Sequence, residues 1–161
     1  MAGNQAAILI LGSMPGKASL SAQQYYAHPH NLFWRFMAEI TGVMPTAAYE
    51  TRLEGLIKNQ IALWDVLKEC RRDSSLDSDI IEASIVANDF AALFARYPTI
   101  NTIYFNGNKA EQAFKRYALP CLTNTENLTF CKLPSTSPAN ASISLDKKLA
   151  EWMQIKILIG K

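Results

Sequence analysis

Residues 12–34, GSMPGKASLSAQQYYAHPHNLFW, hold the densest group of side chains in this chain that could do chemistry. The segment combines a tight glycine-flanked turn, the adjacent pair Tyr25 and Tyr26, two histidines, and Asn31 directly before an apolar helical pattern. Successive backbone N–H groups in such a turn bind phosphate or carbonyl oxygens, and flat aromatic rings stack on flat ligands. Because ordinary connections are shorter, the segment indicates a ligand site.

The elements that must position this segment follow from four short apolar runs separated by helical patterns. This alternation predicts an α/β fold of three layers, α/β/α, with a central four-stranded parallel sheet. The segment would then lie at a strand-to-helix junction, where open α/β sheets bind ligands. The four runs are Ala6–Leu11, Ile61–Val66, Ile100–Phe105 and Leu128–Leu133.

Helical periodicity and stop signals predict five helices between and after these runs. Asn88 is a plausible N-cap of the third helix, and Pro98 would end it. The five ranges are Leu32–Ile40, Tyr49–Lys58, Asp89–Tyr97, Lys109–Tyr117 and Ser144 to about Lys156. Right-handed crossovers bring residues 12–30, 65–77, 106–108 and 134–142 to one edge of the sheet, so we expect function there.

Composition limits the alternatives. The 161 residues fit a single domain spanning the whole chain, 1–161, and a net charge of +2 permits local contact with a polyanion without the excess of a non-specific DNA coater. Three cysteines without a CxxC pair give neither a disulfide framework nor a zinc site, so we expect no metal and a reduced compartment. There is no basic leader and no run of roughly 20 apolar residues, which argues against secretion and a membrane span.

Several motifs in this order resemble the uracil-DNA glycosylase superfamily. GSMPG is similar to the GINPG turn of mismatch-specific uracil and thymine glycosylases, and YYAHPHNLFW to their FAHPxNxFW segment. Further along, LPSTSPANASISL resembles the loop that enters the DNA minor groove in that family. With LWDV and SLDS, the set looks most like the hypoxanthine (deoxyinosine) DNA glycosylase branch, and it covers Ile8 to about Trp152.

One departure from the family pattern concerns the attacking water. In the mismatch-specific group the third residue of the first motif is an Asn that orients this water, and here it is Met14, which forms no useful hydrogen bond. The resemblance to the hypoxanthine branch supplies Asn31 as the catalytic residue instead. Asn31 could equally be the N-cap of the helix that begins at the next residue.

The resemblance and the chemistry together define a base pocket. Tyr26 matches the aromatic residue that stacks on the flipped base, although Tyr25 is chemically equivalent and either ring could simply pack on the core. Backbone amides of the first turn would meet the base or the adjacent phosphate. Asp65, which follows a strand, could contact the base edge. The predicted pocket comprises Ser13, Met14, Pro15, Gly16, Tyr25, Tyr26 and Asp65.

DNA contacts are expected from Lys17 and from the small polar loop near the C-terminus, as phosphate clamp and wedge. The alternative for that loop is a solvated connection into the last helix. His28 and His30 could assist the leaving group or only shape their loop. Ser75 and Asp77, in the second long loop, could equally cap turns. The predicted loop contacts are Ser135, Thr136, Ser137, Pro138, Ala139 and Asn140, whereas Lys109, Lys115 and Arg116 are expected on a solvated helix face.

These residues favour a monofunctional DNA glycosylase that flips out and hydrolyses a deaminated base, hypoxanthine first, in base-excision repair. Two alternatives remain: a uracil or G:U/T mismatch-specific glycosylase, and a non-catalytic module that binds nucleotide or damaged DNA. We expect no cofactor, damaged double- or single-stranded DNA as the partner, and a monomer. The expected location is the bacterial cytoplasm at the nucleoid, or a nucleus.

Overall fold

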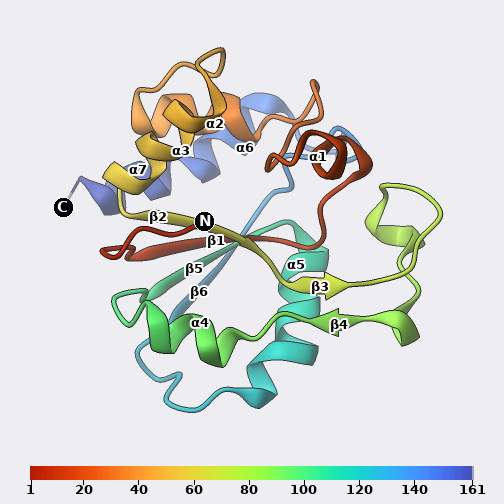
Figure 1. The fold of residues 1–161 in the computed structure, drawn as a ribbon. Coiled ribbons are helices and arrows are strands. Elements are labelled where there is room, and N and C mark those ends of the chain that lie inside the picture. Colours follow the sequence, from red (N-terminus) through yellow and green to blue (C-terminus); the bar gives the residue numbers. More distant parts are fainter. Residues whose placement is uncertain (161) are drawn as a thin grey trace.

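A parallel four-stranded sheet crosses the middle of the molecule in the computed structural model, which describes residues 1–160 (Figure 1). The strand order is β2-β1-β5-β6, and every neighbouring pair is parallel. The predicted sheet is therefore confirmed, with each strand beginning and ending within two residues of its predicted bounds. The strands are β1 (Ile8–Gly12), β2 (Ile61–Asp65), β5 (Thr102–Asn106) and β6 (Thr129–Leu133).

Helices cover both faces of this sheet, which confirms the three-layer architecture (Figure 1). One face packs against α2 (Phe33–Thr41), α3 (Tyr49–Lys58), α6 (Leu145–Trp152) and α7 (Gln154–Ile159). The other face packs against α4 (Phe90–Arg96), α5 (Asn108–Ala113) and a π-helical turn, η3 (Phe114–Ala118). Two apolar clusters, one on each face, form the core.

Some elements differ from the sequence prediction. The last helix is two helices, because α6 ends at Trp152 and α7 begins at Gln154. Asn88 does not cap α4: the Asp89 carboxylate accepts a 3.0 Å hydrogen bond from Ala92 N, while Asn88 Nδ2 donates to the Asp65 carbonyl oxygen. Aspartate caps a helix as well as asparagine does, so sequence alone did not distinguish these neighbours.

The two long connections contain structure that the apolar pattern does not show. The first holds α1 (Lys17–Ala22), a short helix without a buried residue. The second holds a small antiparallel pair, β3 (Leu67–Glu69) and β4 (Val86–Ala87), and two 3-10 turns, η1 (Asp77–Asp79) and η2 (Glu82–Ser84). A further 3-10 turn, η4 (Leu119–Cys121), follows η3. These segments are too short and too polar for periodicity to reveal them.

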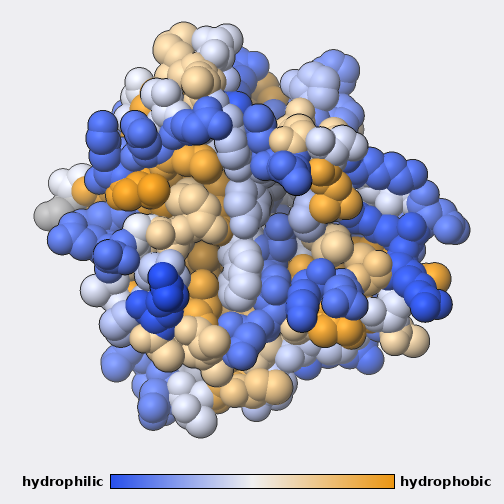
Figure 2. Space-filling model, in the orientation of Figure 1, coloured by the Kyte–Doolittle hydropathy of each residue, from blue (hydrophilic) through white to orange (hydrophobic). Residues whose placement is uncertain are grey.

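The sheet brings its carboxyl ends together at one edge, as the crossover rule predicts. Gly12 at the end of β1 is the register partner of Asp65 at the end of β2, and Asn106 at the end of β5 is the partner of Leu133. Polar and charged side chains cover most of the face seen in Figure 2, with smaller apolar patches between them. None of the helices within residues 1–160 combines the length and apolarity needed to cross a membrane.

Candidate active site

A cleft of about 1060 Å³ opens at the carboxyl edge of the sheet. It brings together every residue that the sequence analysis assigned to the base pocket, to DNA contact and to catalysis. It also contains residues that the analysis left open or did not consider. These further residues are Gly12, Ala18, Ser19, Leu20, Gln23, Gln24, His28, Ser75, Leu76, Asp77, Ser78 and Asn106.

The floor of the cleft depends on a glycine. A Cβ atom added to Gly12 would lie 2.6 Å from Asp65 Oδ1 and 3.0 Å from the Tyr26 hydroxyl oxygen. Since real Cβ atoms do not approach oxygen this closely, only glycine at this strand end lets the Asp65 carboxyl and the Tyr26 hydroxyl converge. The first glycine of the 12–16 turn is therefore explained by close packing within the site.

Asp65 carries the most unusual acid–base property of the cleft. Burial away from water, aided by the negative charge of Asp77, raises the pKa of Asp65 to about 7, against opposing effects of the Met1 amino group and Arg72. Its backbone carbonyl accepts from Asn88, but its carboxyl oxygens have no hydrogen-bond partner among residues 1–160. Asp65 therefore presents a carboxyl group to the cleft that is partly protonated near neutral pH.

The two tyrosines have different environments. Tyr26 has a left-handed backbone conformation, φ 54°, and its ring stacks on Phe33 with a centroid distance of 4.0 Å. Burial raises the pKa of Tyr26, so its phenol stays neutral. Tyr25 is held by its backbone, which receives a hydrogen bond from Trp34 Nε1 at 2.8 Å and donates one to the Tyr49 hydroxyl at 3.0 Å. Both rings line the cleft, so the alternative between them as the stacking residue stays open.

Asn31 has a structural role and also lines the cleft. Its Oδ1 accepts a 3.0 Å hydrogen bond from Phe33 N, two residues ahead, at the start of α2. Asn31 is not the N-cap itself, because the helix begins one residue later than predicted and Leu32 takes that position, but its side chain still bonds the first N–H group of the helix. A carbonyl oxygen has a second lone pair, and the side-chain amide adds two donors. The contact with Phe33 fixes the side chain and leaves these groups for a ligand.

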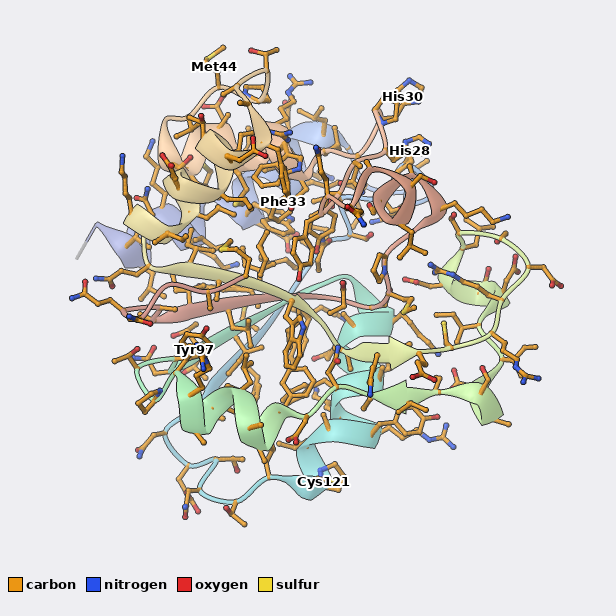
Figure 3. The ribbon with its side chains drawn as sticks, viewed as in Figure 1. His28, His30, Phe33, Met44, Tyr97 and Cys121 are labelled. Carbon is orange, nitrogen blue, oxygen red and sulfur yellow. The ribbon has the colours of Figure 1, made fainter. Side chains whose placement is uncertain are left out.

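The two histidines lie at the outer rim of the cleft. His28 and His30 are exposed and point outward beside α1, whereas Phe33 points into the interior (Figure 3). His28 Nδ1 accepts a hydrogen bond from His30 N at 3.2 Å, which shapes the HPH turn. Only His28 lines the cleft. The His28 side chain therefore shapes this turn, and His30 lies outside the cleft lining.

Hydrogen bonds connect the first long loop to the second. Ser13 Oγ donates to Asp77 Oδ1 at 2.6 Å, and Lys17 N donates to Ser75 Oγ at 3.0 Å. Arg72, whose side chain is only 9% exposed, donates to the Pro15 carbonyl and lies 3.8 Å from the Asp77 carboxylate. Ser75 and Asp77 therefore fasten the first loop and do more than cap their own turns. The amino group of Lys17 reaches the Asp73 carbonyl at 3.1 Å, so this expected phosphate contact is already engaged within the protein.

The loop of residues 134–142 is held from two sides. Asn106 and Thr136 form a reciprocal pair: Asn106 Nδ2 donates to Thr136 Oγ1 and Thr136 N donates to Asn106 Oδ1, each at 2.9 Å. Lys148 in α6, which is 3% exposed, donates to the Asn140 carbonyl. Since Thr136 is fully buried, its hydroxyl builds the loop and does not meet a phosphate, contrary to expectation. Pro138 and Ala139 are exposed at the tip.

Sequence reasoning missed three side chains that hold the cleft together. Asn106 could have been found, because it is the polar residue at the end of the third predicted strand. Lys148 could also have been found, since it lies three residues after Leu145 and four before Trp152, on the buried face of the last predicted helix. Arg72 lies in an irregular polar segment and gave no such signal. Lys115 and Arg116 are exposed, as expected, and lie outside the cleft.

No group of three or more His, Cys, Asp and Glu side chains within residues 1–160 is arranged to hold a metal ion. The groups available in the cleft are carboxyl, amide, phenol, hydroxyl and backbone N–H, with one imidazole at the rim and the amino group of Lys17. Such a set can bind a planar heterocycle, orient a water molecule and transfer a proton.

Comparison with known proteins identifies the family of the site. The sequence profile of the Uracil DNA glycosylase superfamily matches residues 2–157, nearly the whole chain. The chain belongs to the uracil DNA glycosylase superfamily. The resemblance found in its motifs is thus confirmed.

Relatives and a solved structure agree with this assignment. The chain is 41% identical to a "Hypoxanthine DNA glycosylase" of Methanosarcina acetivorans over 146 residues, covering 90% of this chain and 87% of that protein. A protein of the same name from Methanosarcina barkeri is 42% identical over 104 residues, covering 64% of this chain and 65% of that protein. The solution NMR structure of a candidate uracil DNA glycosylase from Methanosarcina acetivorans superimposes with a TM-score of 0.81 at 36% identity, covering 99% and 94% of the two chains.

Proposed function

We propose that this protein is a monofunctional hypoxanthine DNA glycosylase that hydrolyses the N-glycosidic bond of deoxyinosine in base-excision repair. The observation that carries the proposal is the gathering of Asn31, Tyr26 and Asp65 in one cleft, in a chain similar to two proteins named for that activity. Damaged DNA is the partner that such a cleft requires. Its place of action is then the compartment that holds the DNA, a bacterial cytoplasm or a nucleus.

The chemistry assigns different tasks to the parts of the cleft. Cleavage passes through an oxocarbenium-like sugar, so the nucleotide must leave the stack, a water molecule must lie beside C1′, and the departing base must be stabilised. A tyrosine ring supports the flipped base, and Asn31 orients the water or bonds the base. The exposed Pro138 and Ala139 enter the space that the flipped base leaves, while Ser135 and Ser137 contact the backbone.

The engagement of the cleft lysine with the protein's own backbone favours hydrolysis over a lyase reaction. Lys17 is the cleft lysine, and its amino group is bound to the Asp73 carbonyl. We therefore propose that the product is an intact abasic site, without strand cleavage by the enzyme.

The second candidate function is binding of damaged DNA without catalysis, because Met14 replaces the residue that orients water in mismatch-specific glycosylases. Met14 lines the cleft, and its thioether cannot take over that task. If Asn31 does not supply the missing group, the cleft would bind damaged DNA without releasing a base.

The test compares otherwise identical duplexes that carry a single hypoxanthine, uracil, xanthine or mismatched thymine. Incubation with EDTA followed by alkali reveals each abasic site as a strand break, and omission of alkali detects a lyase. We expect alkali-dependent cleavage of the hypoxanthine duplex. Cleavage of the uracil duplex alone would assign the protein to the uracil-specific alternative, and binding without any base release would assign it to the binding module.

A further inference from the structure

Asp65 lies in the cleft at the end of β2. It is next to the Gly12 turn, lines the cleft together with Tyr26, and is half-buried by the strands and loops around it. Its carboxyl oxygens have no hydrogen-bond partner within residues 1–160. A half-buried carboxyl group whose oxygens have no partner in the protein is available to exchange a proton or a hydrogen bond with a ligand in the cleft.

Three charged groups act on Asp65, and none forms an ion pair with it. Asp77 of η1 raises its pKa, while Arg72 and the Met1 amino group lower it, and loss of water is the largest effect. Asp65 in turn contributes to the raised pKa values of Tyr25 and Tyr26. Because the pKa of Asp65 reaches about 7, this side chain can both hold and release a proton near neutral pH.

The other titratable groups of the cleft are less suited to that task. His28 is exposed at the rim, Tyr25 and Tyr26 have raised pKa values and hold their protons too tightly, and Asp77 already accepts a hydrogen bond from Ser13. Asp65 is therefore the best-placed proton donor, because it lies in the cleft and its carboxyl oxygens have no hydrogen-bond partner within residues 1–160.

We propose that Asp65 is the general acid that protonates N7 of the departing purine. This inference rests on the proposed function and narrows its substrate class to 6-oxopurines. As the N9–C1′ bond breaks, its electron pair stays with the base, the Asp65 carboxyl proton moves to N7, and hypoxanthine leaves neutral. Water oxygen bonds to C1′, and the proton that this water loses returns to the Asp65 carboxylate or to solvent, so atoms and charge balance.

Protonation at N7 gives the pocket a way to distinguish purines from uracil. A 6-oxopurine has a basic ring nitrogen beside its carbonyl group, whereas uracil has only weakly basic carbonyl oxygens and must leave as an anion. An acid at this position accelerates the first reaction and does little for the second. Hypoxanthine and xanthine are then the substrates, and uracil a poor one.

The first experiment uses the unaltered protein and an altered substrate, so it does not depend on the folding of a variant. Single-turnover base release is measured from duplexes that carry deoxyinosine or 7-deazadeoxyinosine, which lacks the proton-accepting nitrogen. We expect the 7-deaza substrate to react at least about 100-fold more slowly, since general acid catalysis typically contributes 10²- to 10⁴-fold. Equal rates on the two duplexes would overturn the role of Asp65 at N7.

The second experiment compares Asp65→Asn with Asp73→Asn, a matched change at an exposed aspartate. We expect the unaltered protein to slow above about pH 7, and Asp65→Asn to react about 100-fold more slowly with deoxyinosine and to lack this pH dependence. With the 7-deaza substrate the variant and the unaltered protein should react equally slowly. If Asp65→Asn slowed the reaction of the 7-deaza substrate as much as that of deoxyinosine, the variant and the substrate change would act independently and the proposal would be contradicted. An unchanged pH profile in Asp65→Asn would also contradict it.

These experiments distinguish a wrong function from a wrong role of Asp65. If the unaltered protein releases no hypoxanthine, both the proposed function and the role of Asp65 as general acid are wrong. If it releases hypoxanthine and Asp65→Asn does so at the same rate, the function stands and only the role of Asp65 is wrong.

Discussion

At the scale of single residues, the position of Asn31 is compatible with both roles that its sequence position suggested. Its Oδ1 accepts from Phe33 N, and the residue lines the cleft, so a structural contact does not exclude the proposed catalytic role. The sequence could identify the residue from the HPHN segment, but it could not show this combination, because that depends on how the loop lies against the sheet.

Asn31→Asp separates the two roles, since aspartate caps a helix as well as asparagine does but has no amide donor. We expect Asn31→Asp to keep its thermal stability, whereas Asn31→Ala should lose about 0.5–2 kcal/mol with the cap. If the amide bonds the base, both variants lose hypoxanthine release. If the carbonyl oxygen orients water, Asn31→Asp retains activity. Full activity of Asn31→Ala would contradict any catalytic role.

Asp65 also predicts a pH dependence of folding stability. Its pKa is raised from 3.8 to about 7 in the folded protein, so between these values the folded state binds a proton that the unfolded state has released. Stability therefore falls as pH rises through this window, and the loss is complete above about pH 7.

Asp65→Asn removes this penalty. We expect the variant to be more stable than the unaltered protein at about pH 8 by a few kcal/mol, because one pKa unit corresponds to about 1.4 kcal/mol, with no such gain near pH 4. Denaturant melts at both pH values measure the difference. A stability difference that does not change with pH would show that the Asp65 carboxyl has an ordinary pKa.

At the scale of elements, the loop of residues 134–142 depends on α6. Lys148 is buried and its amino group reaches the Asn140 carbonyl, while Trp152 Nε1 in the same helix donates to the Pro134 carbonyl at 2.9 Å. The helix thus binds both ends of the loop. Composition suggested an irregular DNA-binding loop, but it did not indicate what makes the loop rigid.

Lys148→Met keeps the length of the side chain and removes the donor. We expect it to cost about 1–3 kcal/mol of stability, because the Asn140 carbonyl loses its partner, and to weaken binding of a lesion duplex several-fold. Fluorescence anisotropy measures the affinity. Lys147→Met, at the exposed neighbouring position, is the matched control and should leave affinity nearly unchanged. If Lys147→Met weakened DNA binding as much as Lys148→Met, the loss of positive charge would explain both effects, and not the loss of the hydrogen bond to the Asn140 carbonyl.

The elements that carry apolar runs were predictable, and the polar ones were not. Burial imposes a pattern on β1, β2, β5 and β6, so their positions follow from the sequence. The α1 helix and the β3–β4 pair have few buried side chains, and contacts such as that of Arg72 with Pro15 form only after distant loops have come together. Contacts of this kind hold the first and second loops of the cleft together.

At the scale of the whole molecule, the site exists because parallel strands end at one edge. Four connections from distant parts of the sequence meet there, and each contributes a different chemical group to the cleft. The low net charge of +2 agrees with recognition through this cleft and not through a broad basic surface.

The most direct test of the account is mass spectrometry of the free base released from a duplex that carries a single deoxyinosine, with EDTA present. The account predicts free hypoxanthine in amounts equal to the abasic sites formed, and little free uracil from a matched uracil duplex. Release of uracil without hypoxanthine, or of no base from a duplex that the protein binds, would contradict it.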